Sequence, residues 1–315
     1  MWGLFDGGVL QCVCSGIANS ACVIGNSRKG GGLEMSISQV VPRERLMRIG
    51  PVQGWLGLNL REMADYRELL YFFVWRDIKI RYKQTAIGAA WAVLQPLLTM
   101  LVFSIFFGRL AKIPSHGLPY PVFYYTALLP WTYFATALQN ATSVVVDQQR
   151  IITKVYFPRL VLPLSATLSG LVDFGVAFLV YVPIQLYYGI MPTRAIMLLP
   201  IFLFLAVLTA LGVGLWLSAL NAIYRDVRYI VPFLVQFWLF ASPVAYPSSL
   251  VPPRWRVIYG LNPMAGVIEG FRWALTGQGR PPDLLVLASW AMVLLMLFGG
   301  LVYFQKMETT IADVV

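Results

Sequence analysis

Long stretches without a charged side chain constrain this chain more than any other feature. Five of them lack Asp, Glu, Lys and Arg altogether: residues 84–108, 113–146, 195–224, 229–253 and 284–305. A sixth, residues 160–193, carries Asp173 alone. An apolar stretch of about 18 or more residues can cross the roughly 30 Å hydrocarbon core of a bilayer as a helix. A β-barrel would show short alternating segments instead. The pattern therefore predicts an all-α integral membrane protein.

The composition agrees with this interpretation. Only 12% of the residues are charged and 58% are hydrophobic, whereas a soluble domain carries roughly 25% charge. The net charge of +10 would suggest a nucleic-acid partner in a soluble protein. Here the basic residues flank membrane spans, where they meet anionic lipid headgroups. We therefore expect a lipid bilayer as partner and no nucleic acid.

The uncharged stretches predict six transmembrane helices. We place them at about residues 88–108, 121–143, 162–188, 196–219, 229–247 and 284–304. The connecting segments on the same side of the membrane as the N-terminus hold the larger share of Lys and Arg. We therefore expect a multi-pass protein of the cell inner membrane with both termini in the cytoplasm. Residues 257–268 are apolar but too short to cross, which suits a re-entrant hairpin between spans five and six.

Composition also divides the chain into segments. Residues 1–50 form an N-terminal extension that we expect to be disordered or to include a misassigned start. Residues 1–34 are rich in Gly, Ser and Cys, and Met35 is the alternative start. Residues 61–86 alternate charged with large apolar side chains, which favours an amphipathic cytoplasmic helix in the membrane interface, or one packed on a partner. Residues 88–306 form the transmembrane domain, and residues 307–315 a cytoplasmic tail. The cysteines lie only in the extension, so we expect no disulfide in the membrane region.

Several chemistries are excluded by missing residues. The chain has no G-x-x-x-x-G-K-[ST] motif, so it lacks a phosphate-cradling loop of its own. His116 is the only histidine, which excludes a Ser-His-Asp triad and a His-rich metal site. We therefore predict no catalytic, cofactor or metal residues and no enzymatic activity in this chain.

A few polar and aromatic residues inside the apolar region are candidates for function. Asp173 is expected to make an interhelical hydrogen bond or to line a pore, with proton coupling as a weaker alternative. Tyr124, Trp131 and Tyr133 are candidates for a channel wall, because flat aromatic faces can slide against sugar rings, although an interface belt explains them too. Glu269 and Arg272 lie three residues apart and can form an ion pair at the outer surface or contact substrate.

The connection at residues 147–159 has an unusual pattern. It is charged at both ends, apolar in the middle and ended by Pro158. A simple connection would be shorter and more polar. The pattern predicts a small helix that enters a groove on another protein.

Several ordered motifs resemble those of the type-2 ABC transporter permeases that export O-antigen, capsule or teichoic-acid chains. They are RDIKIRYKQT at residues 76–85, LQPL at 94–97, KVYFPR at 154–159, YRDVR at 224–228, SPV at 242–244 and LNPM at 261–264. The resemblance covers roughly residues 61–306.

The resemblance implies a homodimer of permeases with two separate subunits that bind ATP and Mg, and a lipid-linked glycan as substrate. It implies an ATPase coupling helix containing Arg150, Ile152, Lys154, Tyr156, Phe157 and Arg159. A second ATPase contact would hold Arg225, Asp226 and Arg228. A cytoplasmic gate would hold Arg76, Asp77, Lys79, Arg81 and Lys83. The outer re-entrant helix would carry Asn262, Pro263, Glu269 and Arg272.

Two other functions remain open at this point. One is a type-2 exporter of a small drug or lipid, which would need a narrow and mostly apolar path. The other is an integral-membrane enzyme acting on a lipid-linked sugar, which would need clustered acids or a metal motif. Secondary transport would need an inverted repeat or broken ion-binding helices, and the sequence shows neither.

Overall fold

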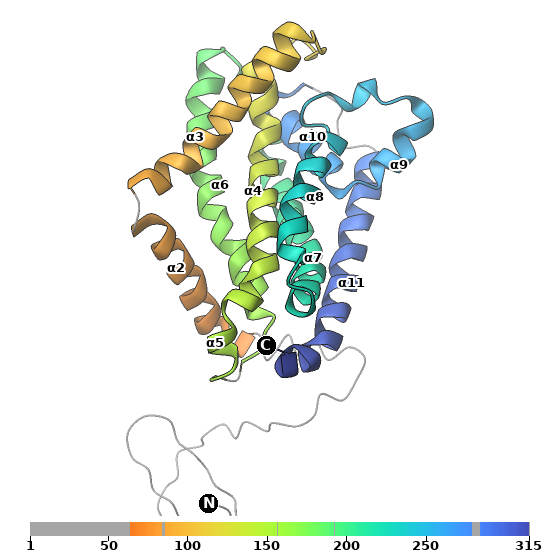
Figure 1. Cartoon of the computed structure of the whole chain (residues 1–315). Coiled ribbons are helices and arrows are strands. Elements are labelled where there is room, and N and C mark those ends of the chain that lie inside the picture. The colour runs from red at the N-terminus through yellow and green to blue at the C-terminus, as the bar shows by residue number, and fades with distance from the viewer. Residues whose placement is uncertain (1–63, 84–85, 156, 192, 279–283, 315) are drawn as a thin grey trace, which may run out of the picture. The chain divides into compact units, whose positions relative to one another are not determined.

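The computed structural model describes residues 64–83, 86–155, 157–191, 193–278 and 284–314, and every regular element among them is helical. The prediction of an N-terminal extension, and Tyr156 in the expected coupling helix, lie outside the described residues. Figure 1 shows long helices side by side, with short helices gathered at their ends. The helices of the bundle are α3 (Ala86–Phe103), α4 (Tyr120–Asp147), α6 (Val161–Tyr187), α7 (Leu199–Ile223), α8 (Val227–Ala241) and α11 (Leu284–Val314). The other elements are α2 (Arg67–Lys83), the π-helical η1 (Ser104–Leu110), α5 (Gln149–Ile152), η2 (Arg194–Leu198), η3 (Ser248–Leu250), η4 (Pro253–Trp255), α9 (Arg256–Gly260) and α10 (Pro263–Thr276).

Four helical stretches among the described residues are long and apolar enough to cross a membrane: Ala90–Leu110, Val161–Tyr187, Arg194–Ile223 and Val286–Glu308. This confirms an all-helical membrane protein but not the predicted count of six spans. α4 has 28 residues but falls outside the set, because Thr, Asn and Gln side chains interrupt its apolar sequence. α8 has only 15 residues and ends where Ser242 turns the backbone into an extended conformation.

The core forms where α4, α6, α7 and α11 meet. Buried aromatic and aliphatic side chains of α4, such as Phe123, Tyr125 and Phe134, fill its centre. α7 and α11 approach closely at two glycines. A Cβ atom at Gly212 would lie 2.8 Å from the backbone nitrogen of Leu297, and one at Gly300 would lie 2.5 Å from the Gly212 carbonyl oxygen. Small residues at such crossings let helix backbones touch, which strengthens packing inside a membrane.

The connecting segments divide between two ends of the helix bundle (Figure 1). We call the end that carries α5 and the α7–α8 connection the loop end. Asp147 and Arg228 meet there across 3.7 Å. We call the end that carries α9 and α10 the hairpin end. α10 is 14 residues long, so it extends about 21 Å and cannot cross the roughly 30 Å hydrocarbon core. Its re-entrant character stays a prediction.

α2 differs from the predicted amphipathic helix. Phe73 is buried against the bundle, but Tyr71, Phe72 and Trp75 are exposed on other sides of the helix. The apolar and charged side chains therefore do not separate into two faces. The alternation seen in the sequence has a period shorter than the helical repeat, so it spreads both kinds of residue around the helix.

Candidate functional site

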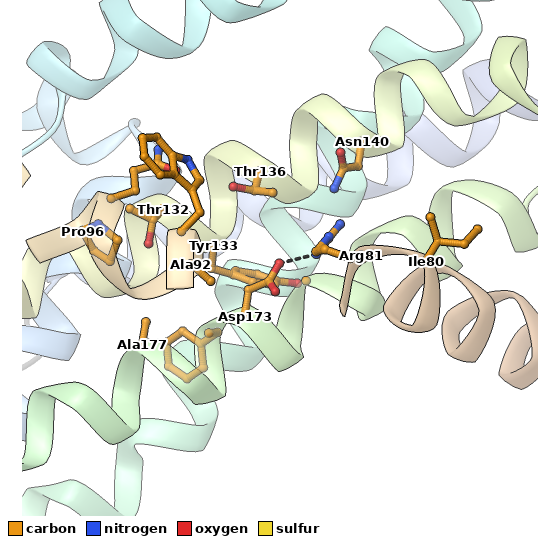
Figure 2. A pocket seen from close by; sticks show the side chains of 14 residues that line it. Ile80, Arg81, Ala92, Pro96, Thr132, Tyr133, Thr136, Asn140, Asp173 and Ala177 are labelled. Carbon is orange, nitrogen blue, oxygen red and sulfur yellow. Dashed lines mark hydrogen bonds and ion pairs between the residues drawn. The ribbon is translucent and has the colours of Figure 1, made fainter. Parts of the chain in front are cut away.

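A cavity of about 610 Å³ lies between α2, α3, α4 and α6. We call it the inner cavity. Figure 2 shows the side chains that line it. Apolar walls come from Trp91, Pro96 and Phe174, among others. The polar lining residues are Arg81, Gln95, Thr132, Tyr133, Thr136, Asn140 and Asp173.

One polar row runs along α4. Thr132, Thr136 and Asn140 are four residues apart, so they share one face of the helix and point into the cavity together (Figure 2). Thr132 donates its hydroxyl hydrogen to the Leu128 carbonyl oxygen at 2.8 Å. Its oxygen keeps acceptor capacity toward the cavity. The row offers hydroxyl and amide groups to a polar ligand along about two helical turns. Sequence reasoning missed these residues, although their spacing inside an uncharged stretch was a visible signal.

Asp173 is held from the other side of the cavity by α2. Its carboxylate forms an ion pair with Arg81 and accepts a hydrogen bond of 2.6 Å from the Tyr82 hydroxyl. Burial, together with the hydrogen bond to Asp173, raises the pKa of Tyr82 to about 12, so this hydroxyl keeps its proton at neutral pH. Asp173 lies near the middle of α6. The end of α2 therefore reaches deep along the bundle and closes one side of the cavity.

The predicted channel-lining residues separate into two groups. Tyr133 and Asp173 line the inner cavity. The Tyr133 hydroxyl donates to the Thr167 carbonyl oxygen at 3.2 Å, and its ring packs on Gly170, where a Cβ atom would lie 3.3 Å from it. Tyr124 and Trp131 are instead buried in the core and do not line this cavity. A role for them in a channel wall stays a prediction.

The middle of α2 contacts the segment that was predicted to dock on a partner. The Arg76 guanidinium donates to the Gln148 side-chain oxygen at 3.2 Å and bonds Asp77 at 2.9 Å. The rings of Phe73 and Phe157 lie 5.7 Å apart. Lys79 and Lys83 are exposed. α2 is thus joined to the loop end at Arg76 and Phe73, and to the inner cavity at Arg81.

The residues predicted for the coupling helix occupy different environments. Arg150 and Lys154 are exposed, and Ile152 is half-buried. Phe157 is only 4% exposed, so its ring belongs to the internal packing of the chain. The Arg159 backbone N–H donates to the Glu308 carboxylate at 3.3 Å, and its guanidinium bonds the Glu308 carbonyl oxygen. Only some residues of the predicted coupling helix, such as Arg150 and Lys154, are therefore exposed to a partner.

The second predicted contact lies beside the first. Arg225 and Asp226 are exposed, and Arg228 faces Asp147 at 3.7 Å. Two connections distant in the sequence thus present basic side chains at the same loop end. This is the arrangement expected if one partner protein contacts both of them.

The hairpin end is fixed by Asn262. Its side-chain oxygen caps α10 by accepting from the Met264 N–H at 3.1 Å and also accepts from the Trp238 indole at 2.9 Å. Its amide donates to the Ala241 carbonyl oxygen and the Ser242 hydroxyl at 3.2 and 3.0 Å. Pro263 follows at the first helical position, where a missing N–H leaves no bond unmade. The end of α8 and the start of α10 are therefore joined tightly.

Arg272 is buried, so the expectation that it lies exposed at the outer surface is wrong, whereas its pairing with Glu269 stays a prediction. It is 4% exposed, donates to the Pro243 carbonyl oxygen at 2.9 Å and lies 3.9 Å from the centre of the Phe123 ring. Glu269 is half-buried one helical turn away. The inward face of α10 places the guanidinium in the protein interior, which the three-residue spacing alone could not reveal.

Apolar helices long enough to span a bilayer surround a polar cavity, and α2 connects that cavity to a basic loop surface. Among the described residues no group of three or more His, Cys, Asp or Glu side chains could hold a metal ion. A polar cavity walled by membrane-spanning helices defines a membrane transport protein.

The chain belongs to the ABC-2 type transporter family, whose model matches residues 68–276. It is 33% identical over 243 residues to the O-antigen export system permease protein RfbA of Myxococcus xanthus, an alignment that covers 75% of this chain and 92% of the relative. It is 26% identical to an RfbA of Klebsiella pneumoniae, over 82% of this chain and all of the relative. It is also 24% identical to the polysialic acid transport protein KpsM of Escherichia coli, over 74% of this chain and 91% of the relative.

Proposed function

We propose that this chain is the permease subunit of an ATP-driven exporter that moves lipid-linked polysaccharide across the inner membrane. The inner cavity carries the proposal. Its row of Thr132, Thr136 and Asn140 offers hydrogen-bond partners for sugar hydroxyls, and Trp91 and Phe174 offer apolar surface for ring faces or a lipid chain. The relatives named for O-antigen and polysialic acid transport support the same class of substrate. A narrow apolar path, as expected for a small drug, would not need this polar row.

The mechanism follows from the two attachments of α2. Two partner subunits bind ATP with Mg and contact the exposed Arg150, Lys154 and Arg225 at the loop end. Their closure displaces the segment that holds Gln148 and Phe157, and α2 moves with it through Arg76 and Phe73. Movement of α2 separates Arg81 from Asp173 and opens the inner cavity to substrate. The partner's ATP-dependent contacts thus favour one of two states of the permease.

The proposed assembly is a homodimer of permeases with the loop end and both termini in the cytoplasm. α4 and α8 complete six spans in this arrangement, because α4 is buried among other helices and needs less apolar surface toward lipid. Several large apolar side chains of α3 are exposed within one chain, including Leu94, Leu98 and Leu101. Lipid or the second permease would cover this apolar face. α9 and α10 form the outer hairpin.

Loss of the protein provides the direct test. Cells without it should accumulate undecaprenyl-linked polymer in the cytoplasmic leaflet and lack the polymer at the surface. Re-expression of the intact chain should restore surface polymer, whereas re-expression without the ATP-binding partner should not. Normal surface polymer in the absence of this chain would reject the proposed function.

A further inference from the structure

A second cavity, of about 400 Å³, lies at the hairpin end, far from the loop end that carries the predicted ATPase contacts. We call it the outer cavity. It is enclosed by the segment before α4, the η3 region and α10. Its polar lining residues are His116, Ser248, Ser249, Glu269, Arg272 and Gln278. The volume falls in the range of roughly 300–1,000 Å³ that is typical of small-molecule sites.

The lining combines several kinds of polar group in a small space. Glu269 provides a carboxylate that accepts hydrogen bonds, and Arg272 provides a guanidinium that donates them. Ser248 and Gln278 can do both. One acid and one base face the same cavity, so no single sign of charge is concentrated there. Such a lining fits a neutral ligand with many hydroxyl groups better than a phosphate or an ammonium ion.

Arg272 is prepared for a ligand by its fixed surroundings. The Pro243 carbonyl oxygen and the Phe123 ring hold the guanidinium in place. Its Nε–H has no hydrogen-bond acceptor among the described residues. Most buried polar groups in proteins are paired, so an unpaired donor beside a polar cavity points to a group that the protein chain does not supply. A preorganised donor also loses little rotamer freedom when a ligand arrives.

The mouth of the outer cavity is bridged by two loops. The His116 imidazole and the Ser249 hydroxyl lie 3.0 Å apart, although they are 133 residues apart in the sequence. Both side chains are exposed. The bridge is a single polar contact between exposed groups, which is weak in water. A passing hydroxylated chain can replace it with equivalent hydrogen bonds.

We propose that the outer cavity is a sugar-binding subsite that holds the exported glycan as it leaves the permease. This inference rests on the proposed function, because it takes the glycan as the cargo. The subsite would contact one or two neutral sugar rings through Ser248, Glu269, Arg272 and Gln278. Its role would be to hold the glycan at the outer side while the inner cavity accepts the next length of chain.

The test uses the complete permease with its ATP-binding partner, reconstituted in vesicles. The double variant S248A/Q278A removes two polar groups of the lining and leaves Arg272 in its packed position. The probes are the strain's own undecaprenyl-linked O-polysaccharide for export and the same polysaccharide released by mild acid for binding. Export is measured by lectin access to the glycan, and binding by saturation-transfer NMR on the solubilised complex. Q236A, which changes an exposed residue of α8 outside both cavities, is the matched control.

The double variant should lower the export rate about fivefold to tenfold and weaken binding of the released glycan about tenfold, with an unchanged thermal midpoint. Q236A should match the wild type. Equal export and binding in the double variant and the wild type would overturn the sugar subsite and leave the proposed function standing. Displacement of the glycan by millimolar inorganic phosphate would also overturn it, since that result would show an anion site. A wild-type complex that binds the glycan but does not export it would reject the proposed function alone.

Discussion

Two short helices, α10 and α2, are attached to the bundle in opposite ways. Every residue of α10 is buried except Glu269 and Trp273. In α2, which is three residues longer, only Phe73 is buried. α10 is surrounded by other helices and capped by Asn262, whereas α2 is held by one buried side chain, Phe73, and by the partly exposed polar contacts of Arg76 and Arg81.

The difference shows which part of the molecule is free to move. Moving α10 would expose a large apolar area at about 25 cal/mol for each Å² and leave Arg272 buried without its partners. Moving α2 exchanges partly exposed polar contacts for water, and each of these is worth only about 1 kcal/mol. We therefore expect α10 to act as a fixed support for the outer cavity and α2 to act as the moving gate of the inner cavity.

The largest expected effect tests the rigidity of α10. A Cβ atom at Gly270 would lie 2.2 Å from the Phe202 ring, so Gly270→Ala must displace that ring or the helix. Overpacking of this kind costs about 1–3 kcal/mol. The thermal midpoint of the purified protein should fall by several degrees. Gly175→Ala is the control, because nothing lies within 4 Å of its added Cβ atom. An equal midpoint for both variants would contradict a tightly packed α10.

The second prediction weakens the attachment of α2 at the inner cavity. Asp173→Asn keeps the size of the side chain but removes the charge that holds Arg81. The pair is partly exposed, so its loss should cost about 1–2 kcal/mol of α2 docking. ATPase activity of the complex without substrate should rise severalfold, because the gate opens more often. Lys79→Gln, an exposed charge change on the same helix, should leave that activity unchanged. Unaltered ATPase activity in Asp173→Asn would show that the pair does not restrain the gate.

The third prediction concerns the attachment of α2 at the loop end. Phe73→Leu keeps an apolar side chain but removes the aromatic contact with Phe157, which is worth about 0.5–1.5 kcal/mol. Export should fall a few-fold while the ATPase rate with substrate stays near normal. Phe72→Leu changes an exposed neighbour and should leave export intact. If both variants exported alike, the Phe73–Phe157 contact would not transmit the movement.

The smallest effect is expected where both partners are exposed. Asp147 and Arg228 lie 3.7 Å apart at the loop end, with side chains 53% and 38% exposed. Exposed ion pairs contribute about 0–1 kcal/mol. Asp147→Asn should therefore change the thermal midpoint by no more than about a degree and reduce export less than Phe73→Leu does. A larger loss of export with normal stability would place Asp147 directly in the ATPase contact.

The amino-acid sequence was enough to predict that this chain lies in a membrane and that its structure is helical. Uncharged stretches of sufficient length predict membrane helices, because the bilayer imposes that length on any helix that crosses it. The missing phosphate-cradling loop led to the prediction that a separate chain hydrolyses ATP. The motifs at residues 154–159 and 224–228 predicted two related surfaces, and the structure places both at one end of the bundle.

Which residues act together depends instead on how the helices pack. Arg81 and Asp173 are 92 residues apart, and neither helix alone indicates the ion pair that joins them. Phe157 was predicted to contact a partner protein and Arg272 to lie at the outer surface, yet both are buried. A helical period shows which side chains share a face, but which face meets which neighbour depends on how the helices dock. Length and polarity are local properties of a segment, whereas a cavity or an interhelical ion pair is a property of the contacts between segments.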